Sequence, residues 1–188
     1  YVVKLSSVGE HIWSTYLGGM GTDTGRGIAV DSSGACYVTG ATTSGGWIHG
    51  GWDASLSGVE DNYEVKLNSS GGHLWSTYLG GTGFESLDFQ DIAVDSSGAC
   101  YATGRTSSIG WVSGGWDVIF DGLGDYDYDA YVVKLNSAGG HVWSSYLGGT
   151  ASETGCGIAV DSTGDNVWVT GNTTSAGWIV NGWRTVYG

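Results

Sequence analysis

The sequence predicts an all-β fold built from a four-stranded antiparallel unit that repeats along the chain. Three observations support this prediction. Four short segments recur in the same order, the 188 residues include 36 glycines and no proline, and no segment has the sustained apolar period of an amphipathic helix. Glycine supplies tight turns, and a chain without proline keeps nearly every backbone N–H available for a β-ladder. With 40% hydrophobic residues, the chain can also bury a core.

Two of the recurring segments predict one β-hairpin in each repeat. The first reads YVVKL at 1–5, YEVKL at 63–67 and YVVKL at 131–135. The second reads HIWSTYLGG at 11–19, HLWSTYLGG at 73–81 and HVWSSYLGG at 141–149. Both are rich in β-branched and aromatic residues, and a turn such as NSSGG separates them. We therefore expect them to form two adjacent antiparallel strands.

The other two segments predict a second hairpin. The third reads GIAVD at 27–31, DIAVD at 91–95 and GIAVD at 157–161. The fourth reads CYVTG at 36–40, CYATG at 100–104 and VWVTG at 167–171. The intervening DSSGA or DSTGDN is a compact turn, because aspartate and serine bond the local backbone and glycine accepts positive φ.

Four-stranded units in series fit a β-propeller, whose blades pack face to face. GIAVD suits the innermost strand because its small residues can crowd around the axis. The outermost strand then carries Trp13, Trp75 and Trp143, which fill the widening gap between blades together with Tyr16, Tyr78 and Tyr146. We interpret residues 1–188 as one propeller segment. Its parts are an outer half-blade (1–19), two blades (27–81 and 91–149) and an inner half-blade (157–188).

The run DAYVVKLNSAGGHVWSSYLGG, followed by GIAVDSTGDNVWVTG, closely resembles the repeats of the bacterial SBBP family. The resemblance covers essentially the whole chain, in three copies. It implies a predicted seven-bladed propeller on a secreted or cell-surface protein, with no established catalytic residues. Many members of that family carry a phenylalanine-proline stretch in the long loop. This chain has GWIHGGWD, GWVSGGWD and GWIVNGWR there instead.

Composition argues against two classes of partner. The formal net charge of −13 would repel a nucleic-acid backbone. No apolar run approaches the roughly 20 residues that a bilayer-spanning helix needs, so we expect no membrane insertion. The chain opens on an apolar strand without an initiator methionine or signal peptide, so we expect a processed or excised piece. Cys36 and Cys100 occupy equivalent positions in different repeats, and we expect both to be buried free thiols.

The two ends of the chain are complementary half-blades, which predicts self-association. Propellers typically have four to eight blades, so about three blades cannot close a ring. Either the chain is part of a longer protein, or it pairs with copies of itself. Two copies joined head to tail would supply six blades, and each junction blade would combine both chains.

The long loop after the fourth segment is a candidate ligand site. Paired tryptophans flanked by glycine and aspartate could stack on sugar rings, as in a lectin with one site per blade. The candidates are Trp47, Trp52, Asp53, Trp111, Trp116, Asp117, Trp178 and Trp183. The alternative is that these tryptophans fold back and cap their own blades.

The acidic stretch DGLGDYDYDAY at 121–131 is a candidate calcium site. It gathers Asp121, Asp125, Asp127 and Asp129, and carboxylate oxygens are ligands that Ca²⁺ prefers. It lacks the glycine and glutamate of an EF-hand. The alternative is a solvated acidic turn.

We expect no enzymatic activity. His11, His73 and His141 occur once per repeat beside a tryptophan, which indicates packing or surface polarity, and GxSxG is absent. The residues that break the repeat, and from which an enzyme would have to be built, are Arg26, His49, Glu85, Asp88, Arg105 and Cys156. The sequence therefore predicts a non-catalytic structural or interaction module of an extracellular or cell-surface protein. A lectin-like propeller is the alternative.

Overall fold

The computed structural model describes residues 1–85, 88–123 and 127–186, which form twelve β-strands and no helix. The all-β prediction is therefore confirmed, and within these ranges no helix is present that could cross a membrane. The strands are β1 (Val2–Leu5), β2 (His11–Thr15), β3 (Asp23–Val30), β4 (Cys36–Thr42), β5 (Asp61–Leu67), β6 (His73–Leu79), β7 (Asp91–Val94), β8 (Cys100–Thr106), β9 (Asp129–Leu135), β10 (His141–Leu147), β11 (Glu153–Val160) and β12 (Val167–Thr173).

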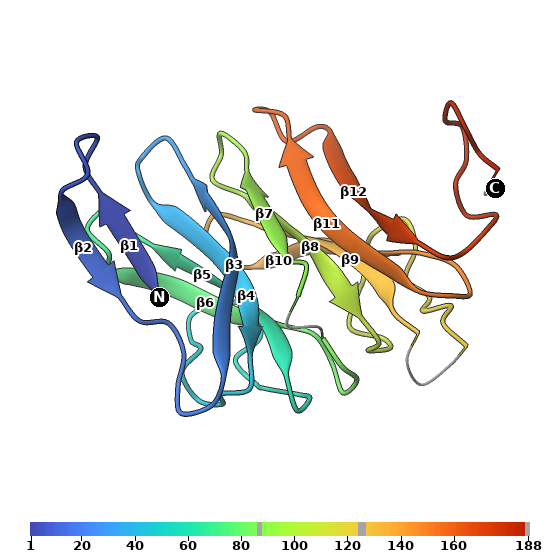
Figure 1. Cartoon of the computed structure of the whole chain (residues 1–188), viewed down its shortest axis with the longest axis horizontal. Helices are drawn as coiled ribbons and strands as arrows, with labels where there is room; N and C mark the ends of the chain where they lie inside the picture. The colour runs from blue at the N-terminus through green and yellow to red at the C-terminus, as the bar shows by residue number, and fades with distance from the viewer. Residues whose placement is uncertain (86–87, 124–126, 187–188) are drawn as a thin grey trace.

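The strands form four antiparallel sheets that follow one another along the long axis of the molecule (Figure 1). The order is β1–β2, then β3–β4–β5–β6, then β7–β8–β9–β10, and finally β11–β12. Strand β7 contacts both β3 and β11, so the strands that contain the IAV motif lie next to one another. The described residues form an open row of sheets and not a closed ring.

The turns form for the reasons that the sequence suggests. In the β3–β4 turn, Asp31 Oδ1 accepts hydrogen bonds from the N–H groups of Ser33 (2.9 Å) and Ala35 (3.1 Å). Gly34 has φ +79° there, a conformation that costs glycine little. In the β5–β6 turn, Asn68 Oδ1 accepts from Ser70 and Gly72 in the same way.

Neighbouring sheets pack through tryptophan on glycine and through buried tyrosines. The Trp75 ring on β6 lies against Gly139 in the next sheet, where a Cβ atom would be 2.6 Å from the ring. Trp13 on β2 lies against Gly71 in the same way, at 2.9 Å. Six tyrosines are fully buried: Tyr37, Tyr63, Tyr78, Tyr101, Tyr131 and Tyr146. Cys36 and Cys100 are buried and free, as expected.

The long loop after β4 returns along the outer strand of its own sheet, which the sequence did not predict. Gly50 forms a parallel bridge with Ser76 on β6, and Tyr78 N–H donates to the Asp53 carbonyl (2.9 Å). The loop after β8 repeats this arrangement, with a bridge between Gly114 and Ser144 on β10. The outer strand is therefore held on one edge by its sheet and on the other by this loop.

Candidate functional site

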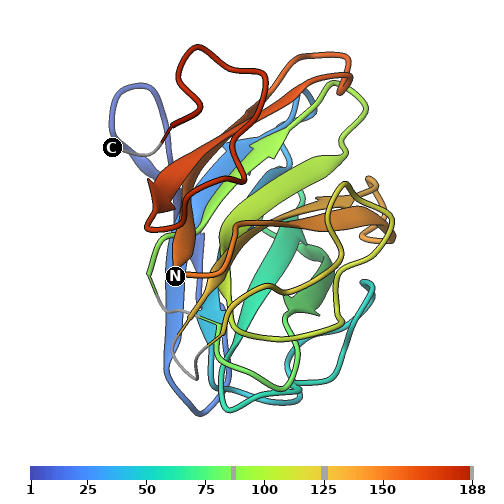
Figure 2. The same cartoon turned by 90° about the vertical axis from the view of Figure 1, so that its right-hand side faces the viewer.

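Strand β12 repeats the sequence pattern of the buried strand β4, but its own residues are not buried. All seven residues of its counterpart β4 are buried, whereas none of the seven residues of β12 is. The cause is topological, because β4 lies between β3 and β5, whereas β11 is the one described strand to which β12 is hydrogen-bonded. Figure 2 looks at the molecule from this β11–β12 end. The free edge of β12 presents backbone groups that another strand could pair with.

An apolar groove lies beside this edge. It has a volume of about 1000 Å³ and separates β12 from β9 and β10. Its apolar lining includes Val167, Val169, Val132, Leu147, Trp143 and Trp116. In the four-stranded sheets, this position relative to the preceding sheet is occupied by the third and fourth strands. The groove is therefore the place where two further strands would complete the sheet.

The opposite end of the molecule lacks the matching half. The β1–β2 sheet has the sequences of a third and a fourth strand, and no first or second strand pairs with it among the residues that the structure describes. Tyr16, after β2, is 93% exposed, whereas its counterpart Tyr78 is 1% exposed and donates to the Ser44 carbonyl (2.7 Å). A second groove, of about 500 Å³, lies between β1 and the β3–β4 hairpin.

The loop after β12 is also more exposed than its two counterparts. Ile48 and Val112, in the loops after β4 and β8, are 4% and 5% exposed, whereas Ile179 at the equivalent position is 40% exposed. The first two loops lie along β6 and β10, but no described strand occupies that place beside the third loop. The exposure of the loop therefore has the same cause as that of β12.

The first tryptophan of each loop pair folds back onto its own sheet. The indole N–H groups of Trp47, Trp111 and Trp178 donate to Thr42, Thr106 and Thr173 at 3.2, 3.3 and 3.1 Å. Trp47 and Trp111 also meet the edges of Tyr63 and Tyr131 at 5.1 Å between ring centroids. All three tryptophans are partly buried, so their faces serve packing.

The second tryptophan of each pair reaches toward the next sheet. Trp52 stacks on His141 of β10, with ring centroids 4.2 Å apart, and lies 6.5 Å from Trp111. Trp116 is 68% exposed and Trp183 is fully exposed. Trp52 is thus a contact between neighbouring sheets, while Trp116 and Trp183 leave open aromatic surface.

The loop aspartates stabilise turns. Asp53 Oδ1 accepts from Ser55 N–H (2.8 Å), and Asp117 Oδ1 accepts from Ile119 N–H (2.9 Å). These carboxylates are therefore engaged by their own loops.

The structure spreads the acidic stretch over several environments. Asp129 is buried at the start of β9 and accepts from Asp121 N–H (3.3 Å), while Asp127 accepts from Leu123 N–H (3.2 Å). Asp125 lies outside the described residues. Within the part of the chain that is described, no three His, Cys, Asp or Glu side chains are grouped so that they could hold a metal ion. Calcium binding by this stretch stays a prediction.

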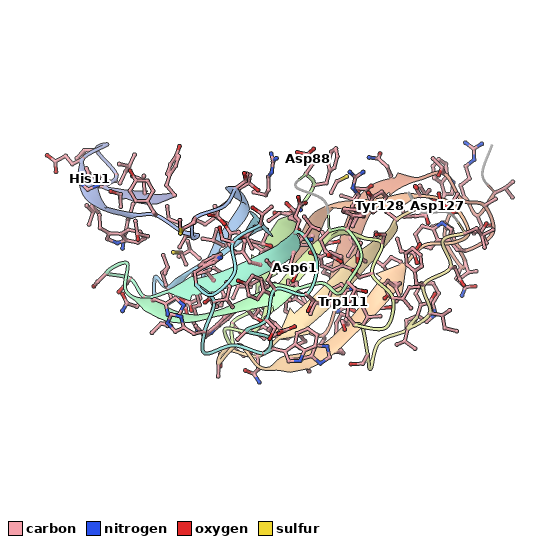
Figure 3. The ribbon with its side chains drawn as sticks, turned by 90° about the horizontal axis from the view of Figure 1, so that it is seen from below. His11, Asp61, Asp88, Trp111, Asp127 and Tyr128 are labelled. Carbon is pink, nitrogen blue, oxygen red and sulfur yellow. The ribbon has the colours of Figure 1, made fainter. Side chains whose placement is uncertain are left out.

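The residues that break the repeat do not form one cluster. Arg26 pairs with Asp88 at 2.6 Å, and Arg105 lies over the Tyr128 ring at 4.6 Å. The ring of His49 lies against that of His73 on the outer strand β6, with ring centroids 4.2 Å apart and the planes tilted by 36°. Glu85 is buried and Cys156 is an exposed thiol. Figure 3 shows Asp88 and Tyr128 on the side of the molecule away from Trp111.

A pair of carboxyl groups lies at each of two contacts between sheets, which the sequence analysis missed. Asp61 at the start of β5 is close to Glu85 of the next unit, and Asp129 is similarly close to Glu153. Burial raises the pKa of both Asp61 and Glu85. The charge of Asp61 raises the pKa of Glu85 further, whereas the hydrogen bond between the two carboxyl groups acts to lower the pKa of Asp61. Burial likewise raises the pKa of Asp129 to about 7. The signal in the sequence was the recurrence of aspartate two residues before Tyr63 and Tyr131.

The chain contains a recognisable repeat. Residues 12–46 match the SBBP family, described as a beta-propeller repeat. The matched range covers most of β2, all of β3 and β4, and the start of the long loop. No curated protein matches the chain. The resemblance drawn from the sequence is thus confirmed for this range, and the all-β sheets of two and four strands agree with it.

Proposed function

We propose that this chain is a non-catalytic structural and interaction module that assembles through completion of its two-stranded sheets. The observation that carries the proposal is the free edge of β12 beside an apolar groove of about 1000 Å³. A β-propeller repeat is an interaction architecture, and an unpaired strand edge with exposed apolar residues favours strand addition. A secreted or cell-surface location is part of the proposal and is based on the resemblance to SBBP-repeat proteins.

An assembly of this kind would serve as a rigid scaffold for the loops. Strand addition satisfies the free N–H and C=O groups of β12 and removes apolar side chains such as Val169 from water. The sheets then hold the tryptophan-containing loops in fixed positions. Weak contacts made by several such loops add through avidity.

The solution mass of the chain tests this proposal. We expect light scattering to give a mass above the 19.5 kDa of one chain, because exposed strand edges and apolar grooves favour association. Val169→Lys places a charge in the groove and should return the mass to that of a monomer. Val59→Lys is the matched control, because Val59 is exposed and lies outside both grooves. A monomeric unmodified chain at about 100 µM would contradict blade completion.

Glycan binding is the second candidate, favoured by the open aromatic surface of Trp116 and Trp183. Stacking of a sugar on Trp183 should quench tryptophan fluorescence. Trp183→Ala should remove that quenching and leave the solution mass unchanged, whereas Val186→Ala nearby should leave both unchanged. Absence of quenching across a panel of oligosaccharides would reject the lectin alternative.

A further inference from the structure

We infer that the first long loop, residues 43–60 between β4 and β5, opens away from β6 in mildly acidic solution. The loop is closed while the neutral ring of His49 rests on the neutral ring of His73, and it opens when both rings bind a proton. This response involves one four-stranded sheet and its own loop. It is separate from assembly through the two-stranded sheets.

Ser76 on β6 holds the two histidines against each other. His49 N–H donates to Ser76 Oγ (3.0 Å), and Ser76 N–H donates to the His49 carbonyl (2.9 Å). His73 Nε2 lies 3.0 Å from the same Oγ atom. With the loop fixed in this way, the two ring centroids are 4.2 Å apart and the ring planes are tilted by 36°.

Each of the two rings can bind one further proton. His49 Nδ1 lies 3.3 Å from the Trp47 carbonyl, which can only accept, so Nδ1 carries the hydrogen of the neutral ring and Nε2 is open to a second one. A neutral His73 gains a proton in the same pH range. Among the described residues, neither histidine forms an ion pair with a carboxylate. Protonation of both rings would therefore place two like charges in contact.

Closure of the loop opposes this protonation. Burial, and then the charge of His49, lower the pKa of His73. An open loop exposes both rings to water, where a histidine titrates near pH 6.5. The open loop thus binds protons more readily than the closed loop. Closure is favoured most above that pH, and it is lost as the pH falls through the lowered pKa of His73.

Other charged groups on the neighbouring elements are engaged elsewhere. Two lysines, on β1 and β5, donate to backbone carbonyls, and two aspartates accept from N–H groups of the first long loop. One glutamate accepts from the Cys100 thiol, and the other lies near Asp88 and Arg105 of the next unit. These groups are Lys4, Lys66, Asp53, Asp61, Glu64 and Glu60. Burial and His49 are therefore what set the pKa of His73.

The same loop also covers a histidine of the next sheet. Trp52 stacks on His141 of β10, with ring centroids 4.2 Å apart. Burial lowers the pKa of His141, so its protonation opposes closure in the same direction. Opening of the loop would release the face of Trp52 that His141 covers. Acid would thus uncover an aromatic surface on this loop.

The second long loop, which follows β8, repeats the backbone contacts without the histidine pair. Ser113 occupies the position of His49. Its N–H donates to Ser144 Oγ (2.9 Å), and Ser144 N–H donates to its carbonyl (2.8 Å). The second loop is therefore a control within the same molecule.

Hydrogen exchange of four backbone amides tests the inference on the unmodified chain. Ser76 and Tyr78 N–H groups donate to the first loop, and Ser144 and Tyr146 N–H groups donate to the second. Each amide loses its acceptor when its loop opens, so its protection from exchange measures opening. Each pH unit by which closure lowers a histidine pKa changes the opening equilibrium about tenfold. After correction for intrinsic exchange rates, we expect protection of Ser76 and Tyr78 to fall about tenfold from about pH 7 to about pH 5, and that of Ser144 and Tyr146 to fall less than about threefold.

His49→Phe separates the effect of charge from that of packing. Phenylalanine keeps an aromatic ring against His73 but cannot bind a proton. We expect the protection of Ser76 in this variant to change with pH no more than that of Ser144. His11→Phe is the matched control, because His11 lies on β2 outside the pair, and it should leave the response of Ser76 unchanged.

Three results would overturn the inference. Protection that falls by the same factor at Ser76 and Ser144 would show a general loosening of both loops. A full response of Ser76 in the His49→Phe variant would show that the histidine pair is not its cause. Protection of Ser76 that is the same at about pH 5 and about pH 7 would show that the loop stays closed in acid.

Discussion

Trp75→Ala is expected to lower the free energy of unfolding by about 3–5 kcal/mol, the cost of truncating a buried tryptophan. Trp75 is 3% exposed and meets the edge of Tyr37 at 6.2 Å between ring centroids. Its indole N–H donates to the Ser137 carbonyl (3.1 Å), and its ring lies on Gly139. The substitution would leave a cavity between two sheets and would leave the Ser137 carbonyl with Lys66 Nζ as its donor (3.1 Å). Urea denaturation followed by circular dichroism measures the loss.

Trp143→Ala is the matched comparison, because Trp143 occupies the same position in the next repeat. Its ring meets Tyr101 at 6.4 Å between ring centroids, and it lines the groove beside β12, where no described four-stranded sheet packs against it. In a Val169→Lys background, which keeps the chain monomeric, we expect Trp143→Ala to cost less than half as much as Trp75→Ala. If both variants lose the same free energy of unfolding, the packing of tryptophan between sheets is not what stabilises this fold.

The strands were predictable where local sequence and tertiary pairing agree. YEVKL and CYVTG are apolar or β-branched and are bounded by turn residues, and they appear as β5 and β4. The innermost strand was predicted to begin at Gly27, but β3 begins at Asp23. Asp23 and Gly25 have weak β propensity, and they become strand residues because Thr42 and Gly40 pair with them. Such an extension is imposed by the partner strand and leaves no local signal.

The candidate site was predictable only in part, for a similar reason. The sequence indicated that the two ends were complementary, because the order of the segments alone carries that information. The stacking of Trp52 on His141 depends on how the long loop runs along β6, which no local pattern encodes. Both carboxyl pairs are also contacts between repeats. Aligning the repeats locates Asp61 and Asp129, but only the packing of sheets brings them to Glu85 and Glu153.

Raising the pH from about 5 to about 8 is expected to lower the free energy of unfolding by several kcal/mol. Burial raises the pKa of Glu64 and of Asp129 to about 7, and it also raises that of Glu85. In an unfolded chain these carboxyl groups titrate near pH 4. The folded state therefore binds their protons more tightly. The resulting stability is fully present below pH 4 and is lost as the pH rises through about 7.

The size of this change in the free energy of unfolding depends on the difference between the pKa values of the folded and the unfolded states. Each pH unit between them is worth about 1.4 kcal/mol, so Glu64 and Asp129 each account for roughly 3 kcal/mol when treated singly. The turn aspartates act in the opposite direction at lower pH. Burial acts to raise the pKa of Asp31 and Asp95, but hydrogen bonds from their turns lower it overall, so that stability is lost as the pH falls below about 4. Maximum stability is therefore expected near pH 5.

Asp129→Asn tests the assignment of this effect to a buried carboxyl group. The amide is neutral at every pH and nearly the same size, and Asp129 Oδ1 has no hydrogen-bond partner among the described residues. We expect the variant to match the unmodified chain near pH 5 and to be more stable by about 2–3 kcal/mol near pH 8. Asp165→Asn, at an exposed turn, is the matched control and should change the free energy of unfolding little, because the side chain of Asp165 faces solvent. If the free energy of unfolding of the unmodified chain instead rises between pH 5 and pH 8, the prediction is wrong. Asp129 would then be ionised in the folded protein and held by a cation or by donors from a partner molecule.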